Sequence, residues 1–228
     1  MEKGEQKRKN KGFTLVELII VMAIMTIIAT AIALAVIRYI EKGRIAMDVY
    51  NAGLIKDALN VYPFPSDFQG RVVNYTDPET GETESYKRGW VYVDKDEIRC
   101  SDQSCAIAMI QAGLVHVSPE MEQALIDNEE SKVRWFPSGP DGDYVRRSGI
   151  DEYVFKNSLT VKAKTTWNTY QLDVYVDGDG EIHLGGSASN AIRVGGHAKD
   201  SKTARLFSSK VGLEGAWDTP IGEQYNGN

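Results

Sequence analysis

Cysteine, histidine and proline are scarce in this chain, which has two, three and seven of them among 228 residues. Two cysteines cannot build the set of several disulfides that holds small secreted scaffolds together. The histidines form no His-Glu-x-x-His set, and the sequence has neither a Gly-x-Ser-x-Gly motif nor a phosphate-binding loop. We therefore expect a protein that is not an enzyme and that uses no cofactor.

An excess of positive charge is also missing, because 26 lysines and arginines stand against 32 acidic residues, for a net charge of −6. Binding to DNA or RNA depends on cationic side chains that neutralise phosphates, so nucleic acid is not the expected partner. The acidic surplus instead suits a soluble surface outside the cell.

One stretch lacks charge almost entirely, because residues 13–37 hold a single charged side chain, that of Glu17. As an α-helix these residues rise about 38 Å, which exceeds the hydrocarbon core of a bilayer at about 30 Å. A carboxylate at depth in such a helix costs on the order of 2.5–3.5 kcal/mol. We predict a membrane span over residues 13–37 in which Glu17 gains a partner on assembly.

The residues before this run are basic, with five lysines and arginines against two glutamates over residues 1–12, a side-chain charge of +3. Basic flanks of a membrane span stay on the cytoplasmic side. The N-terminus is therefore expected inside, and everything after the span outside.

The junction from Lys11 to Glu17, Lys-Gly-Phe-Thr-Leu-Val-Glu, resembles the processing site of type IV prepilins and pseudopilins. The resemblance implies that a prepilin peptidase cuts between Gly12 and Phe13 and that Phe13 is then N-methylated. It also implies that Glu17 pairs with the terminal amine of a neighbouring subunit. Such an ion pair is much stronger in an apolar bundle than in water, and it would set the axial register of the subunits.

Three other interpretations of the apolar run stay open. It could be a plain membrane anchor, or a core helix of a soluble domain, which its length and uniform apolarity disfavour. It could also be a secretory signal peptide, since small-residue cleavage patterns end at Ala31, Ala33 and Ala35. The run is longer than a typical signal core, and Glu17 interrupts its start. Unlike many type IV pilins, the chain has no proline or glycine over residues 13–42.

The fold class expected from these features is α+β, with three parts: a cleaved leader over residues 1–12, a long helix over 13–62 and a globular head over 63–228. The helix should continue past the membrane because apolar residues recur every seven positions as a stripe for packing on a sheet or on neighbouring helices. The stripe consists of Ile40, Met47, Leu54 and Val61. The prolines that follow it should end the helix.

Within the head, residues 67–88 and 135–149 have the composition of loops, the former with a turn at Thr80-Gly81. The sequence predicts strands over 90–94, 159–164 and 170–176, and the last of these should form a hairpin with residues 181–184. A second glycine-ended segment at 191–196 echoes that strand. Short helices are predicted over 104–114, from an N-cap at Ser118 to about residue 127, and around 204–208.

Three sets of side chains in the head are candidate sites. Cys100 and Cys105 are close in sequence, and in an exported protein such a pair predicts a disulfide; a zinc site with His116 is the alternative. The Asp-Gly-Asp triplets at 141–143 and 177–179 raise the question of calcium, but neither continues as an EF-hand loop. We interpret them as carboxylate-rich turns and expect no metal. The aromatic residues of the head are expected in the core or at a subunit interface rather than at a ligand. The four considered are Trp135, Phe136, Trp167 and Trp217.

Taken with the resemblance, the expected function is that of a structural subunit of a type IV pilus, a fimbrial filament with roles such as cell adhesion and twitching motility. The chain would wait in the cytoplasmic membrane with its head outside, and membrane assembly machinery would then polymerise it into an extracellular pilus. The alternatives are a pseudopilin of a type II secretion or DNA-uptake system, and a minor tip pilin that acts as an adhesin. A membrane-anchored enzyme is a distant third.

Overall fold

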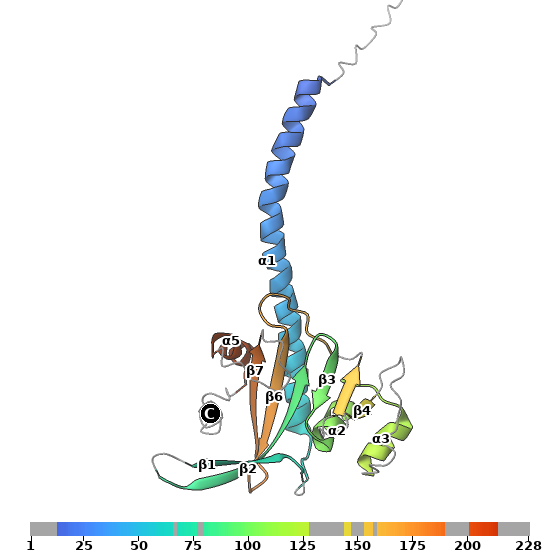
Figure 1. Ribbon diagram of the computed structural model, residues 1–228, viewed down its shortest axis with the longest axis vertical. Helices are drawn as coiled ribbons and strands as arrows, with labels where there is room; N and C mark the ends of the chain where they lie inside the picture. The colour runs from blue at the N-terminus through green and yellow to red at the C-terminus, as the bar shows by residue number, and fades with distance from the viewer. Residues whose placement is uncertain are drawn as a thin grey trace, which may run out of the picture. The chain divides into compact units, whose positions relative to one another are not determined.

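The computed structural model describes residues 13–65, 68–76, 80–127, 144–146, 153–156, 159–189 and 201–213. The chain divides into two compact units, residues 1–42 and residues 43–228. The described helices, labelled in Figure 1, are α1 (Leu15–Val61), α2 (Gln103–Gln111), α3 (Pro119–Ile126) and α5 (Ser201–Val211). The strands are β1 (Arg71–Thr76), β2 (Thr83–Val93), β3 (Glu97–Cys100), β4 (Tyr144–Arg146), β5 (Tyr153–Lys156), β6 (Thr169–Val176) and β7 (Ile182–Ser189).

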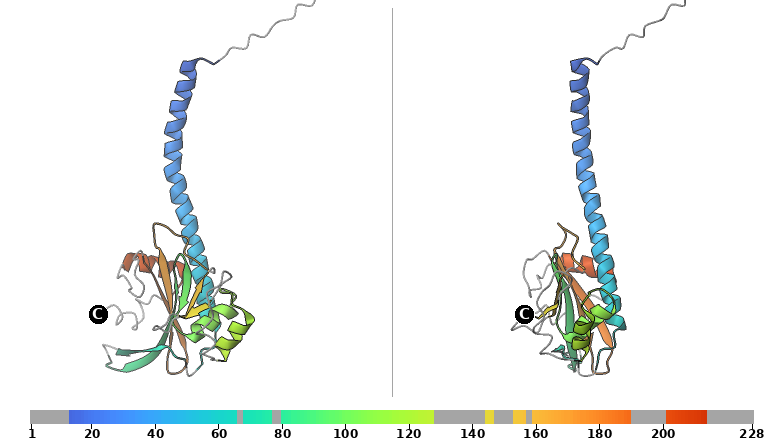
Figure 2. Two further views of the ribbon diagram at one scale, coloured as in Figure 1. Left: turned by 45° about the vertical axis from the view of Figure 1, so that its right-hand side comes forward. Right: turned by 90° about the vertical axis from the view of Figure 1, so that its right-hand side faces the viewer.

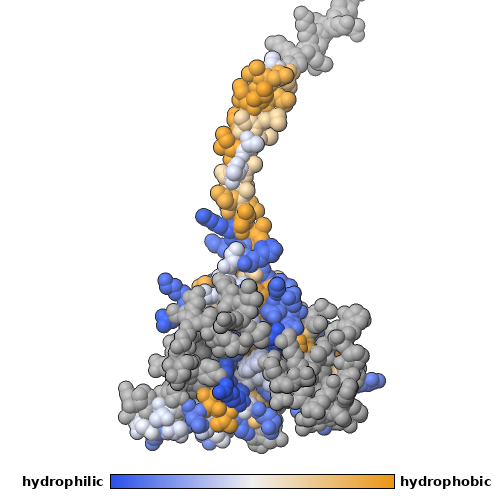
Figure 3. Space-filling view, viewed as in Figure 1, coloured by the Kyte–Doolittle hydropathy of each residue, from blue (hydrophilic) through white to orange (hydrophobic). Residues whose placement is uncertain are grey.

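The first unit consists of the apolar part of α1. The described residues contain one helix that is long and apolar enough to cross a membrane, and none of its most apolar window is buried. Figure 3 colours this segment as predominantly hydrophobic. Its threonines satisfy their own hydroxyls, since Thr26 donates to the carbonyls of Met22 at 2.9 Å and Ala23 at 2.8 Å, and Thr30 donates to the carbonyl of Thr26. The helix therefore offers an almost wholly apolar surface that needs lipid or other apolar helices around it.

The second unit is built on an antiparallel sheet of seven strands. Its strand order is β4-β5-β3-β2-β6-β7, and β1 pairs with the first half of β2. The second half of β2 lies between β3 and β6, with Val91 opposite both Cys100 and Leu172. The expected α+β class, a long N-terminal apolar helix followed by a head with an antiparallel sheet, is confirmed.

The part of α1 that belongs to the second unit lies along one face of the sheet, as the views of Figure 2 show. Ala52, Ile55 and Leu59 are fully buried and share the core with Val91 and Leu172. These helical residues are three or four positions apart, which places them on one face of the helix.

The sheet does not cover most of the stripe that the sequence predicts. Met47 and Val61 are 51% and 80% exposed, and Ile40 is 46% exposed. The helix carries a second apolar face beside the stripe, and the sheet covers that second face. The exposed stripe is left available to other molecules, which the sequence had allowed as neighbouring helices.

The other face of the sheet carries a buried ion pair. Arg88 of β2 contacts Asp173 of β6 through Nη2 and Oδ1 at 2.6 Å, and both side chains are at most 6% exposed. Gln171 donates to the same carboxylate at 2.8 Å, and the guanidinium of Arg88 lies 6.0 Å from the ring centre of Tyr175. A shift of β2 along β6 would separate the two side chains and leave each as an unpaired buried charge. The ion pair therefore favours the observed register.

Most of the predicted helices and strands are confirmed. The structure has β6 and the hairpin to β7, the Ser118 cap at α3, whose hydroxyl accepts from the amide of Met121 at 3.3 Å, and the helix near residue 204. Strand 90–94 forms the second half of β2. Residues 191–196 lie outside the described part of the chain.

Two segments taken for loops contain strands. Residues 71–76 and 83–93 form the β1–β2 hairpin, although the predicted turn is present at Gly81, where φ is +73°. Strand β4 lies within the segment 135–149. These strands form because neighbouring strands pair with them, although their own sequences lack a clear strand pattern.

The predicted strand over residues 159–164 is wrong, because the segment is irregular in the structure. The reason is a buried carboxylate on α1. Asp48 accepts hydrogen bonds from the amides of Lys162 at 2.7 Å and Ala163 at 2.9 Å, and from Nε1 of Trp167 at 2.9 Å. Amides held by this carboxylate cannot take part in a sheet ladder.

Gly89 of β2 packs closely against the N-terminal end of α2, and a substitution there probes this packing. A Cβ at this position would lie 2.7 Å from Oδ2 of Asp102 and 2.8 Å from Sγ of Cys105. We expect Gly89→Ala to lower the free energy of unfolding by about 1–3 kcal/mol, as overpacking does. Urea unfolding of the full chain in detergent, followed by tryptophan fluorescence, measures this. Gly53→Ala is the matched control, because its Cβ would meet nothing within 4 Å and alanine favours the helix. Equal midpoints for the two variants would contradict the prediction.

Candidate functional site: the N-terminal end of α1

The first turn of α1 is held by reciprocal hydrogen bonds between Thr14 and Glu17. Oε2 of Glu17 accepts from the backbone amide and from the hydroxyl of Thr14, both at 2.9 Å. The amide of Glu17 in turn donates to the hydroxyl oxygen of Thr14 at 3.3 Å. Thr14 also accepts the first helical bond, from the amide of Leu18 at 3.2 Å. This is a capping box, in which the N-cap and the third helical residue satisfy each other's amides.

The capping box is a feature of this site that the sequence analysis did not predict. Its signal was present, because Thr-x-x-Glu before an apolar run is the pattern of such a box. The sequence predicts a partner for Glu17 only in a neighbouring subunit. The structure gives the carboxylate a structural role inside the chain in addition to any role between chains.

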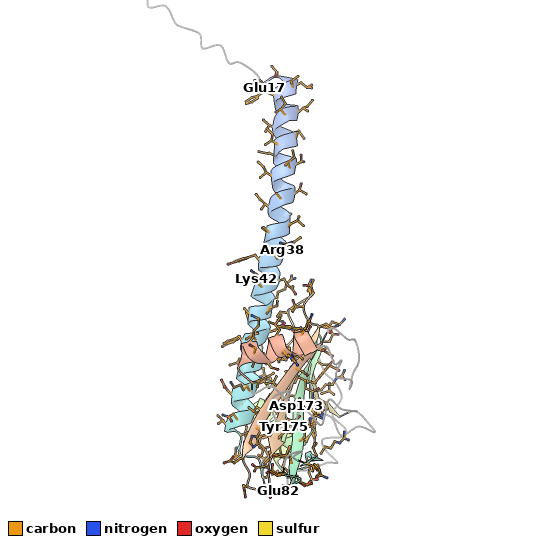
Figure 4. All side chains as sticks on the ribbon, turned by 90° about the vertical axis from the view of Figure 1, so that its left-hand side faces the viewer. Glu17, Arg38, Lys42, Glu82, Asp173 and Tyr175 are labelled. Atoms are coloured by element: carbon orange, nitrogen blue, oxygen red, sulfur yellow. The ribbon has the colours of Figure 1, made fainter. Side chains whose placement is uncertain are left out.

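The capping box fixes where the carboxylate lies. Both hydrogen bonds from Thr14 use the same oxygen, and within the described chain no hydrogen bond reaches Oε1 of Glu17. Phe13, directly before the box, is 85% exposed. Figure 4 places Glu17 at the N-terminal end of the helix. A carboxylate held this way can still accept hydrogen bonds from another molecule, because each of its oxygens has two lone pairs.

The predicted cleavage position includes Gly12, which lies outside the described residues. Cleavage after Gly12, methylation of Phe13 and the pairing of Glu17 between subunits therefore stay predictions. What the structure adds is that the helix begins at Leu15, directly after the residues at which the peptidase would act.

Cys100 and Cys105 are free and buried in the structure, and their pairing in a disulfide stays a prediction. Burial raises the pKa of both thiols well above the usual value, and the nearby carboxylate of Asp102 acts in the same direction. Asp102 is held in place as the N-cap of α2, where it accepts from the amide of Cys105 at 3.0 Å. A raised pKa disfavours the thiolate, which is the form that attacks to make a disulfide.

One group of described residues could hold a metal ion: Asp177, Glu181 and His183, with ligand atoms within 4.8 Å of one another. One carboxylate oxygen of Asp177 stabilises a turn, because Oδ1 accepts hydrogen bonds from the amides of Asp179 at 2.9 Å and Glu181 at 2.8 Å. Its other oxygen lies 3.5 Å from Nε2 of His183. This geometry accounts for the triplet at 177–179 as a carboxylate-rich turn.

The remaining candidate sites of the head have these outcomes. Within the described residues His116 does not join the two cysteines in a metal-binding group. The triplet at 141–143 lies outside the described residues, as do Trp135, Phe136 and Trp217. Trp167 is fully buried in the core, as the sequence predicted.

A long N-terminal apolar helix followed by a head with an antiparallel sheet is consistent with the type IV pilin fold. Residues 7–33 match a family model described as the prokaryotic N-terminal methylation motif. The chain thus carries the class III signal of type IV prepilin-like proteins, and the match ends within α1. No curated protein and no solved structure matches the chain. The motif supports a secreted subunit of the pilin or pseudopilin type, a class of structural proteins.

Proposed function

We propose that the protein is a structural subunit of a type IV pilus, polymerised through α1 after removal of residues 1–12. The observation that carries this proposal is the combination of an unburied apolar helix with a single carboxylate held at its N-terminal end. A helix of this kind can leave lipid for a bundle of like helices at little net cost, since both surroundings are apolar.

In the proposed sequence of events, the precursor first rests in the cytoplasmic membrane with its basic leader inside and its head outside. Prepilin peptidase cuts between Gly12 and Phe13, which creates a protonated α-amine. Assembly machinery in the membrane then extracts the subunit. The amine of one subunit pairs with Glu17 of a neighbour, and the capping box has already placed that carboxylate at the helix end. Head-to-tail contacts that do not close into a ring give an open helical assembly, so the proposed product is a filament on the cell surface.

The exposed stripe on the later part of α1 supports the same function. Met47 and Val61 are 51% and 80% exposed, although they belong to a helix whose neighbouring face is core. Packing of this stripe on neighbouring subunits would bury it in the filament. A pseudopilin would use the same surfaces in a short periplasmic fibre, and a tip adhesin would do so at low copy number.

The first prediction concerns the mature N-terminus. Protein sheared from the surface of the native host should have the intact mass of a chain that begins at N-methylated Phe13, and it should be recovered in long filaments. Gly12→Val should leave the precursor uncut, because the bulky valine side chain would lie directly before the bond that the peptidase cleaves. Filaments should then disappear. N-terminal sequencing and electron microscopy measure both results. A wild-type chain beginning after Ala31, Ala33 or Ala35, or one that retains Met1, would rule out the pilin proposal.

A further inference from the structure

The apolar part of α1 has a charged residue at each end. Glu17 stands at the N-terminal end, and the next charged side chain is Arg38, with residues 18–37 uncharged between them. The two positions are 21 residues apart, a rise of about 31 Å along the helix. Figure 4 shows Glu17 at the start of the helix, and Arg38 and Lys42 about one turn apart further along it.

Arg38 and Lys42 have unused binding capacity. Both side chains are exposed, and within the described chain neither has an ion pair or a side-chain hydrogen bond. Their neighbours Glu41 and Arg44 do have partners. Glu17 also has capacity left, because Thr14 engages only Oε2. Charges of opposite sign, without an ion-pair partner among the described residues, therefore stand at the two ends of one apolar segment.

The 21-residue spacing between Glu17 and Arg38 limits how identical helices can pack in parallel. When one copy is displaced along another, its Glu17 faces the uncharged stretch of the neighbour at almost every displacement. A carboxylate buried against apolar side chains without a partner is strongly unfavourable. The nearest cations of the neighbour lie at two levels: at its terminal amine, after a displacement of about four residues, and at Arg38, the first cationic side chain beyond the apolar stretch, after a displacement of 21 residues in the opposite direction.

We infer that, in the filament, Arg38 of one subunit binds Glu17 of a second copy displaced by 21 residues along the helix axis. The inference rests on the proposed function and adds a second contact to it. The amine and Arg38 come from different neighbours, on opposite sides along the axis, so one carboxylate can receive both. Arginine suits this position because its long apolar stem can lie along the bundle while its guanidinium donates to Oε1, whose two lone pairs accommodate one N–H of Arg38 and one of the amine.

A disulfide introduced at the same spacing tests this register directly. Val21→Cys with Lys42→Cys places thiols 21 residues apart, each one turn beyond Glu17 or Arg38, and leaves both charges intact. Oxidised filaments should give a ladder of cross-linked multimers on a non-reducing gel. Val21→Cys with Ile40→Cys is the control, since position 40 is rotated roughly 160° from position 42 about the helix axis. The native cysteines are buried and should not contribute.

Charge reversal gives a second, independent measurement. Arg38→Glu should reduce filament yield about tenfold or more, Arg38→Lys should reduce it less, and Lys42→Glu should stay near wild type. Absence of a ladder in filaments that contain the Val21 and Lys42 substitutions would overturn the register and leave the proposed function standing. Equal losses for Arg38→Glu and Lys42→Glu would also overturn it, because they would indicate that both cations act only on lipid headgroups. A wild-type protein that forms no filaments would refute the proposed function itself.

Discussion

Replacing Glu17 by glutamine should lower the yield of assembled filaments about tenfold or more, while membrane insertion and leader cleavage continue. Glutamine at this position can still accept both hydrogen bonds from Thr14, since capping boxes use either residue. It cannot attract an amine or a guanidinium as a carboxylate does, because the negative charge is gone. The neutral side chain is also less costly in the bilayer, so the precursor should remain in the membrane. Immunoblots of sheared filaments against membrane fractions measure the ratio.

Two further variants separate the charge of Glu17 from its capping role. Glu17→Leu removes both, and Thr14→Val removes the hydroxyl partner while the charge stays. We expect Glu17→Leu to assemble no better than the glutamine variant, and Thr14→Val to assemble at a level close to wild type. Normal filaments from Glu17→Gln would mean that the carboxylate serves the capping box alone, and both proposed contacts between subunits would then fail.

The second large effect is expected at Asp48, the buried carboxylate that joins α1 to residues 159–168. Asp48→Asn should lower the free energy of unfolding by about 2–3 kcal/mol. The asparagine has one accepting oxygen for three donors, and its NH₂ group would face an N–H that also donates. Urea unfolding followed by the fluorescence of Trp167, which is fully buried beside Asp48, measures the loss. A midpoint unchanged from wild type would contradict the role assigned to this carboxylate.

Asp48 also predicts a dependence on pH. Burial raises the pKa of Asp48, although the amides of Ala163 and Lys162 and the indole of Trp167 act to lower it. An acid whose pKa is higher in the folded state binds its proton more tightly there than in the unfolded chain. Its contribution to stability is therefore largest below the unfolded pKa of about 3.9 and declines as the pH rises through the raised value. The difference in stability between wild type and Asp48→Asn should shrink over that range.

The sequence alone was enough to define the features of the chain that depend on short spacings. The apolar run, the isolated Glu17 and the basic leader are properties of consecutive residues, so composition and helix geometry are enough to find them. The hairpin between β6 and β7 also follows from local chemistry, since a turn of aspartates and glycines lies between two apolar segments. The methylation motif is also a feature of this type, because it is defined by consecutive residues of the chain.

The tertiary structure decided everything that depends on a partner distant in sequence. Two apolar faces run side by side on the later part of α1, and only the sheet determines that Ile55 and Leu59 are core while Met47 and Val61 stay exposed. The alternating residues 159–164 would suit a strand, yet Asp48, more than a hundred residues earlier, takes two of their amides. The two cysteines are near each other in sequence, and only the packed core determines that both are buried rather than exposed. In each case the local pattern allows two outcomes, and the packing and hydrogen bonds of a remote segment select one.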